Sequence, residues 1–195
     1  MINPLEIINN DRLSARSLED ANAELCYLAL SETGSPSVRT LILRTISNDG
    51  LTVFINKTSA KWRTISKNDE AEMLIWYPSL QRQYRIHGVI EELDRAAIEQ
   101  NWPRRPAGSK YLDHATMNFQ AQSQTIDSHA ALASYIKEFR ETHPEDSLTT
   151  PEVAAGIILR PEEIECLDLN SPDRLHDRRR YTLVNGEWKE AQLMP

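Results

Sequence analysis

Apolar and polar positions alternate along much of the chain with the period of two that is typical of β-strands. This alternation, or a strand-like composition, is found in "ELCYLALS", "VRTLILRTIS", "LTVFIN", "AEMLIWY", "RQYRIHGVIEEL", "VAAGIILRPEEIECLDL" and "RLHDRRRYTLV". Turn signals separate neighbouring segments: "ETGSPS", "NDG", Pro78-Ser79 and "NG". In "NDG", Asp-Gly accepts the positive dihedral angles that a tight turn between twisted strands needs. The pattern predicts a sheet of mostly antiparallel strands.

Helical spacing interrupts this pattern in four places. We expect a short helix near Leu13–Asn22 within an N-terminal arm (residues 1–22), and further helices in "TSAKWRTISKN", "DRAAIEQNW" and "SHAALASYIKEFRETH". The stretch "NWPRRPAGS" reads as a turn-rich connector. A mainly β fold with peripheral helices (α+β), built on an antiparallel barrel, explains this order better than a βαβ pattern. We expect a single domain over residues 1–195.

Composition limits the partners of this fold. The 195 residues carry a formal net charge of -7, which argues against nucleic acid or an anionic membrane as a partner. No apolar run approaches the roughly 20 residues that span a bilayer, and the N-terminus lacks the features of a secretory signal, so we expect a cytoplasmic protein. Cys26 and Cys166 lie far apart without a metal-ligand spacing, so we expect two reduced, structural thiols and no metal.

Lys61 occupies an unusual position near a predicted helix start. With Thr58 as the N-cap, Lys61 is the third helical residue, where a capping box would have Glu or Gln. A cation there opposes the helix dipole by about 0.3 to 1 kcal/mol, unless an anion uses the free amides and the ammonium together. A phosphate site and a lysine that simply extends into water both remain open.

Basic residues in the first quarter and near the end of the chain pose the same choice. Arg39 and Arg44 in "VRTLILR" point to opposite faces of a regular strand, either as solvated ends or toward a ligand lying along it. In "SPDRLHDRRRY" the cations alternate and share one face if the stretch is extended, and repeated like charges on one face are destabilising. Acidic side chains of neighbouring strands or a bound dianionic ligand could lie opposite. The alternating residues are Arg174, His176, Arg178 and Arg180.

Four segments together resemble the pyridoxamine phosphate oxidase family in their order and spacing: "RTLILR", "NKTSAKW", "RQYRIHGVIEEL" and "RLHDRRRYTLVNGEWKEAQLMP". The resemblance covers nearly the whole chain after Leu25, and "RLHDR" is its most specific part, because other flavin-binding split barrels share the earlier strands. It implies a split β-barrel homodimer with FMN at the subunit interface. It also implies oxidation of pyridoxamine or pyridoxine 5'-phosphate to pyridoxal 5'-phosphate, with oxygen as acceptor and hydrogen peroxide as product.

The resemblance implies a cofactor role for each matching position. Arg39, Ser59 and Lys61 would bind the FMN phosphate, so the helix start and the family pattern indicate the same place. The other cofactor-binding positions are Thr40, Leu41, Ile42 and Leu43, whose backbone would run beside the flavin ring, Arg44 after them, Phe54 and Ile55 at the dimethylbenzene or ribityl side, Gln83 and Arg178 as flavin contacts, and Gln122 and Ser123 toward the partner's flavin.

The substrate residues follow in the same way. Arg174 and His176 would cover the pyridine ring and orient the carbon that gives up a hydride, and no strong base is required. The positions that match the substrate-phosphate site are Arg44, Asn101, Arg105 and Ser109.

Three positions depart from the family pattern. Ala60 stands where an arginine is usual, Asn101 where a tyrosine is usual, and Leu167 where a tryptophan is usual. Such losses could cost a few kcal/mol of binding unless Arg104 and Lys57 compensate. The alternatives are therefore a related FMN oxidoreductase acting on another small molecule, a non-enzymatic flavin or pyridoxal phosphate binder, and a protein without a ligand.

Overall fold

The computed structural model describes residues 2–32, 34–171 and 173–195. The strands are β1 (Leu25–Glu32), β2 (Ser35–Ser47), β3 (Gly50–Asn56), β4 (Glu70–Tyr77), β5 (Arg82–Glu92), β6 (Ala154–Asp168), β7 (Asp177–Val184) and β8 (Glu187–Leu193). The helices are α1 (Pro4–Ser17), α2 (Ala60–Ile65), α3 (Arg95–Asn101), α4 (Ala107–Asn118) and α5 (His129–Thr142), with 3-10 turns at Pro78–Leu80, Trp102–Arg104 and Glu145–Ser147. Within the described ranges, no helix combines the length and apolar character needed to cross a membrane.

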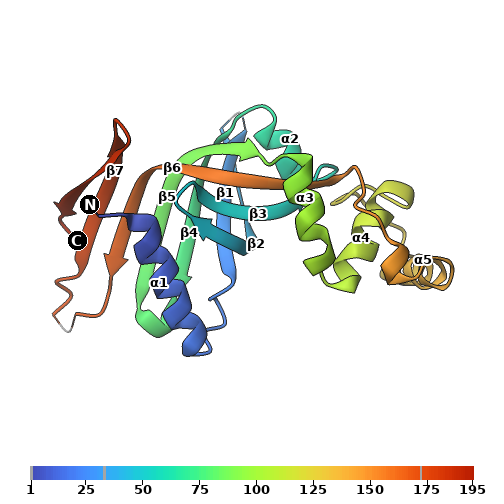
Figure 1. Ribbon diagram of the computed structural model, residues 1–195, viewed down its shortest axis with the longest axis horizontal. Helices are drawn as coiled ribbons and strands as arrows, with labels where there is room; N and C mark the ends of the chain where they lie inside the picture. The colour runs from blue at the N-terminus through green and yellow to red at the C-terminus, as the bar shows by residue number, and fades with distance from the viewer. Residues whose placement is uncertain (1, 33, 172) are drawn as a thin grey trace. The chain divides into compact units, whose positions relative to one another are not determined.

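The strands form one sheet that closes on itself (Figure 1). Their order is β3-β2-β1-β4-β5-β6-β7-β8, and β3 also pairs with β6. The first six strands of this order therefore make a closed barrel, and the β7–β8 hairpin extends the sheet beyond β6. The predicted mainly β fold, an antiparallel split barrel with peripheral helices, is confirmed.

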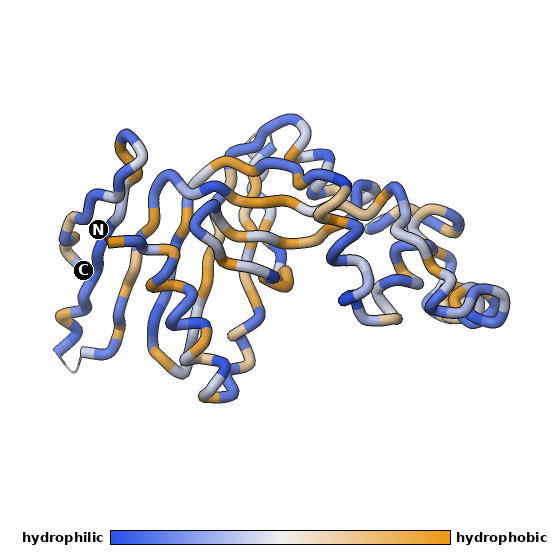
Figure 2. Tube along the Cα trace, viewed as in Figure 1, coloured by the Kyte–Doolittle hydropathy of each residue, from blue (hydrophilic) through white to orange (hydrophobic). Residues whose placement is uncertain are grey.

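The alternation in the sequence places every second side chain of the barrel strands in the core. Burial alternates along β1 and along β4, whose inward residues end at Tyr77. Figure 2 shows the barrel strands as largely hydrophobic and the β7–β8 hairpin as largely hydrophilic. Large side chains with less than 2 % exposure line the barrel interior: Leu28, Leu43, Leu51, Met73, Ile75, Tyr77, Tyr84, Ile86, Leu159 and Ile164.

The chain divides into two compact units. Unit 1 contains Met1–Val53, Lys67–Glu91 and Ile158–Pro195, and unit 2 contains Phe54–Ser66 and Glu92–Ile157. Unit 2 has a core of its own, formed by Ile98, Trp102, Tyr111, Leu148 and Ala154. The single domain expected over residues 1–195 stays a prediction.

The N-terminal helix differs from the expected one. It spans Pro4–Ser17, whereas the helical pattern was placed at Leu13–Asn22, so that prediction was wrong in its bounds. The side chain of Asn3 caps the helix by accepting from the Leu5 amide at 3.1 Å, and proline follows directly at the first helical position. The Asn-Pro pair was the missed signal.

The expected connector at residues 101–109 is also largely helical. Helix α3 runs to Asn101, a 3-10 turn follows at Trp102–Arg104, and α4 begins at Ala107 with Pro106 as its N-cap. Proline and glycine read as breakers inside a helix, but both are tolerated at a helix start. The composition was therefore misread as a turn.

The "NDG" hairpin forms, but with different dihedral angles from those predicted. Ser47 pairs with Gly50, so Asn48 and Asp49 are the turn residues, and neither is among the described residues with positive φ. Gly50 has φ 142°, and a Cβ there would lie 2.1 Å from the carbonyl oxygen of Leu159. Glycine is required by a close strand approach as well as by its dihedral angle.

A second close approach occurs at Gly88 in β5. A Cβ at this position would lie 2.0 Å from the carbonyl oxygen of Arg160, on the neighbouring strand. We expect Gly88→Ala to lower the free energy of unfolding by about 2 to 3 kcal/mol, because the backbone of β6 must move. Gly108→Ala is the matched control, since nothing lies within 4 Å of its Cβ. Denaturant unfolding of both variants checks this, and equal stabilities would contradict the predicted clash.

Candidate functional site

Arg39 of β2 is on the core side of its strand. It pairs across the ladder with Leu28, which is fully buried. Its Nη2 donates to the Ser37 hydroxyl, whereas its Nη1 is buried and has no partner among the described residues. Burial lowers the pKa of Arg39. A buried guanidinium donor without an acceptor is destabilising, so this atom suits a bound anion.

Strand β2 is irregular at Arg44. Leu43 pairs with Val53 while Thr45 pairs with Thr52, which marks a bulge between them. The prediction that Arg39 and Arg44 occupy opposite faces assumed a regular strand and does not apply through this bulge. Bulges re-aim the side chain at which they occur, here the half-buried Arg44.

Helix α2 begins one residue later than predicted. Ser59, not Thr58, is the N-cap, and its hydroxyl accepts from the Trp62 amide at 3.3 Å. Lys61 is therefore the second helical residue, not the third. The helix has only six residues, so its dipole is weak and the argument from it loses force. What remains is the buried Ser59 and, two positions further along the chain, the half-buried Lys61.

The segment around Gln122 lies against α2. The Thr58 hydroxyl accepts from the Gln122 amide at 3.0 Å, and the Lys61 ammonium donates to the Gln122 side chain at 3.3 Å. The next residue, Ser123, has φ 68°, an uncommon value outside glycine. The structure thus brings together predicted cofactor residues that are about 60 positions apart in the sequence.

Gln83 lines a hollow on the outside of the barrel. The hollow is about 300 Å³ and is formed by Tyr27, Leu74, Trp76, Gln83 and Leu169. Trp76 pairs directly with Gln83 across β4 and β5, so both side chains are on one face. The sequence analysis missed Tyr27 and Trp76. The signal was present, since both are apolar residues at outward positions of otherwise alternating strands.

The predicted substrate-phosphate residues of unit 2 include two buried donors. Asn101 Nδ2 and Arg105 Nε have no partner among the described residues. Arg105 Nη2 donates to Asp113 at 2.6 Å, and its guanidinium lies 5.8 Å from the Trp102 ring centre. Burial raises the pKa of Asp113, against the opposing effect of Arg105. Asp113 therefore holds the Arg105 guanidinium in place through Nη2, while Arg105 Nε can still donate a hydrogen bond to a ligand.

The "RLHDR" segment is not extended throughout. Strand β7 begins at Asp177, so Arg174 and His176 precede it and do not share a strand face with Arg178, as was predicted for an extended stretch. Arg174 is exposed and has φ 55°, in the left-handed region. His176 Nδ1 is buried and unpartnered within the described chain.

Carboxylates of β6 face two of the three arginines that lie in β7, whereas Arg179 pairs with Asp177 and Glu190. Arg178 Nη2 donates to Glu165 at 2.9 Å, and Arg180 Nε is 3.8 Å from Glu163. The alternative of acidic neighbours, left open above, therefore holds for Arg178 through a hydrogen bond and for Arg180 through a long ion pair only, because Arg180 Nε has no hydrogen-bond partner among the described residues. Arg174 has no such acidic neighbour in the described part of the chain, so a bound ligand remains the better explanation for a cation at this position.

Unpartnered buried donors concentrate at predicted site residues. In the described part of the chain, seven buried side-chain polar atoms lack a partner, and four belong to residues predicted to bind cofactor or substrate. These four are Arg39 Nη1, Asn101 Nδ2, Arg105 Nε and His176 Nδ1. Buried polar groups are nearly always hydrogen-bonded, so this bias indicates positions prepared for a ligand.

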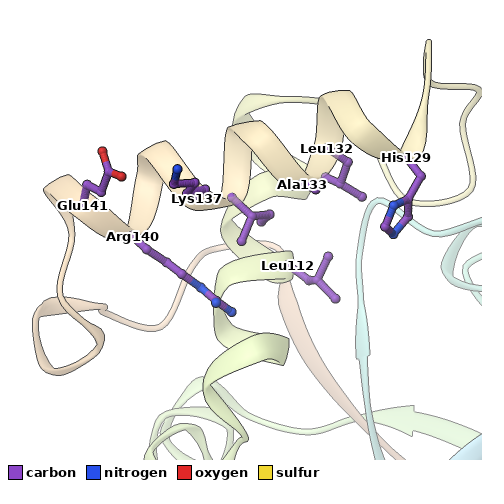
Figure 3. Close-up of a pocket in the computed structure, with 8 residues that line it drawn as sticks. Leu112, His129, Leu132, Ala133, Lys137, Arg140 and Glu141 are labelled. Atoms are coloured by element: carbon purple, nitrogen blue, oxygen red, sulfur yellow. The ribbon is translucent and has the colours of Figure 1, made fainter.

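Two other features carry no predicted site residue. A hollow of about 510 Å³ lies between α4 and α5, with Leu112, Leu132 and Arg140 among the side chains that line it (Figure 3).

The cysteines are free thiols, and burial raises the pKa of Cys26 to about 12 and that of Cys166 to about 11. Neither thiol has the lowered pKa of a reactive nucleophile.

Comparisons with known proteins identify the family of this chain. Residues 18–143 match the family model described as pyridoxamine 5'-phosphate oxidase. The pyridoxine/pyridoxamine 5'-phosphate oxidase of Pseudomonas syringae pv. tomato is 32% identical over 176 residues, covering 90% of this chain and 79% of its own. The enzyme of the same name from Salinibacter ruber is 31% identical over 188 residues, covering 95% and 85%.

Two solved structures share the fold. PhzG from Burkholderia lata 383, in complex with tetrahydrophenazine-1-carboxylic acid, has a TM-score of 0.89 at 24% identity and covers 99% of this chain and 93% of its own. A pyridoxamine 5'-phosphate oxidase-related, FMN-binding protein from Nostoc punctiforme has a TM-score of 0.79 at 20% identity, with both chains covered completely.

Proposed function

This chain belongs to the pyridoxamine 5'-phosphate oxidase family of FMN-binding oxidoreductases, and we propose that it oxidises pyridoxamine or pyridoxine 5'-phosphate to pyridoxal 5'-phosphate. The observation that carries the proposal is the set of buried donors without partners at Arg39, Asn101, Arg105 and His176. The cofactor phosphate would supply the acceptor for Arg39, and the substrate phosphate would supply those for Asn101 and Arg105, while His176 would face the pyridine ring of the substrate.

The residues fit FMN as the cofactor. Arg39 has a buried donor free for an anion, Ser59 and Lys61 present a hydroxyl and an ammonium, and the hollow at Gln83 has aromatic walls. Aromatic and apolar side chains with a few polar groups are typical of sites for flat ring systems. Bound FMN would accept the hydride from the substrate and pass the electrons to oxygen, giving hydrogen peroxide.

The protein's own contribution is binding and orientation. Within unit 2, Arg105, fixed by its ion pair with Asp113, would hold the substrate phosphate together with Asn101 and Ser109. Arg44 keeps the substrate-phosphate role that the family resemblance implies. Arg174 and His176 would lie over the pyridine ring and keep the reacting carbon in place. The side-chain amide of Gln83 would donate a hydrogen bond to the flavin ring.

The outer face of the barrel supports a homodimer as the working state. Val38 is 67% exposed and Ile42 is 50% exposed, next to half-buried Leu25 and Tyr27 of β1. Exposed apolar side chains on adjacent strands are typical of a protein interface. We expect Val38→Asp to convert a dimer to a monomer, as measured by light scattering after gel filtration. A wild-type protein that runs as a monomer would refute the dimer.

A second candidate is a related FMN oxidoreductase with another small substrate. Asn101 replaces the usual tyrosine that would contact the substrate phosphate, and Leu167 and Ala60 replace the usual tryptophan and arginine. Lys57, which could compensate for Ala60, is already paired with Glu92 at 2.6 Å. These departures favour a changed affinity or substrate without removing Arg174 and His176.

Anaerobic addition of pyridoxamine 5'-phosphate to the FMN-loaded protein tests the proposal. We expect the flavin absorbance band to bleach, and pyridoxal 5'-phosphate and hydrogen peroxide to form when air is readmitted. FMN binding with a persistent band would favour the second candidate, to be followed by a panel of other reductants. Failure to bind FMN would refute both.

A further inference from the structure

Arg12 is a buried charge in α1 that the proposed function does not use. Its side chain is 3% exposed, and its donors reach the carboxylate of Glu24, 2.5 Å away, and main-chain carbonyl oxygens. Those carbonyls belong to Ala23, at 3.0 Å, to Arg44, at 3.3 Å, and to Leu43. A buried arginine is rarely needed for stability alone, because its desolvation offsets much of the gain.

Two of the acceptors of Arg12 are main-chain carbonyl groups at the irregular point of β2. Leu43 and Arg44 form the β2 bulge, where the ladder to β3 shifts register. A bulge disrupts the ladder locally, and the guanidinium donates to the main-chain carbonyl oxygens of both bulge residues. Arg12 therefore fixes the backbone that aims the Arg44 side chain.

The preceding residue, Asp11, connects α1 to a second part of the proposed site. Its carboxylate accepts from Arg82 at 2.8 Å and 3.0 Å and from the Tyr84 hydroxyl at 2.5 Å. Arg82 also donates to Asp168 at 2.5 Å, at the end of β6. Arg82 is adjacent to Gln83, and Asp168 is the last residue before the loop that carries Arg174 and His176.

The start of that loop is tied to the same place. The Leu169 amide donates to the Gln81 carbonyl at 2.9 Å, and the Asn170 amide donates to the Asp168 carboxylate at 2.9 Å. At the other end, Asp177 pairs with Asp168 across β6 and β7. The hydrogen bonds that link Asp11 to Arg82 and Arg82 to Asp168 therefore hold the first residues of the loop in place.

We propose that α1 is a positioning element of the substrate site: Arg12 sets the bulge that aims Arg44, and Asp11, acting through Arg82, sets the loop that carries Arg174 and His176. The inference rests on the proposed function for the roles of these three side chains. Neither Asp11 nor Arg12 touches substrate in this proposal. Each acts through another residue.

Arg12→Lys tests the first contact. A lysine keeps the charge but cannot reach several separate acceptors with a planar fork. We expect KM for pyridoxamine 5'-phosphate to rise about tenfold with kcat nearly unchanged, because Arg44 is proposed to bind the substrate phosphate. Amide hydrogen exchange over residues 41–45 should also become faster. Arg16→Lys is the matched control, since Arg16 shares Glu24 as its partner but is a half-exposed residue of the same helix.

Asp11→Asn tests the contact between Asp11 and Arg82, because asparagine has the shape of aspartate but carries no charge. We expect kcat to fall about tenfold while FMN affinity stays within twofold, because the loop that orients the reacting carbon loses its anchor. Faster amide exchange confined to residues 169–171 and 173–176 would accompany this. Hydrogen exchange needs no turnover, so a wild type that fails to oxidise the substrate refutes the proposed function and leaves this test standing.

The proposal is overturned if Arg12→Lys and Arg16→Lys behave alike in KM and in exchange over residues 41–45. It is also overturned if Asp11→Asn leaves kcat and exchange in the loop unchanged. Faster exchange spread evenly over the whole of unit 1 in both variants would assign Asp11 and Arg12 to stability alone, which equally contradicts a positioning role.

Discussion

Replacing Lys61 by methionine should weaken FMN binding by about two orders of magnitude, because a charge-assisted hydrogen bond to phosphate contributes about 1.5 to 3 kcal/mol. Methionine keeps most of the side-chain length and removes only the ammonium. The neighbouring Ser59 hydroxyl stays in place, since it caps α2 through the Trp62 amide. Fluorescence titration of the apoprotein with FMN measures the dissociation constant directly and requires no turnover.

Lys67→Met is the matched control for Lys61→Met. Lys67 is an exposed lysine whose ion pair with Glu32 lies outside the proposed site. An exposed pair contributes at most about 1 kcal/mol, so FMN affinity should stay within twofold of the wild type. If Lys61→Met also binds FMN as tightly as the wild type, the assignment of Lys61 to the cofactor phosphate is wrong.

The barrel could be predicted from the sequence because its signal is repeated along the chain. Strands such as β1 and β4 show clear alternation, and each pairs with one sequence neighbour, β2 or β5, through a short turn. The helices were less predictable. The start of α1 depended on a single capping residue, Asn3, and the start of α4 lay in a segment rich in proline and glycine.

The site was predictable where a residue acts alone and unpredictable where its position depends on distant parts of the chain. Lys61 stood out because a cation near a helix start is unfavourable, even though the true N-cap is Ser59. By contrast, the contact between Lys61 and Gln122 joins positions that no local pattern relates. The acidic partners of Arg178 and Arg180 likewise depend on the register of β6 and β7, which the residues of one strand do not specify.

Arg174 differs from these arginines because its backbone is unfavourable for its side chain. It has φ 55°, and a residue other than glycine or asparagine in this region loses about 1 kcal/mol of stability. The side chain is exposed, so packing does not explain an arginine at this position. Strain retained at an exposed residue is more consistent with a role toward a ligand than with a role in folding.

We therefore expect Arg174→Gly to lower kcat/KM for pyridoxamine 5'-phosphate by about a hundredfold while the free energy of unfolding stays equal or rises by up to about 1 kcal/mol. Steady-state kinetics and denaturant unfolding measure the two quantities. Arg174→Met separates loss of the cation from gain of backbone freedom, and it should show the same loss of activity. Asn185→Gly is the control for the backbone, since Asn185 has φ 52° in the β7–β8 turn and should leave kcat/KM unchanged. A variant Arg174→Met with wild-type kcat/KM would exclude the guanidinium from substrate orientation and would leave His176 as the residue to replace next.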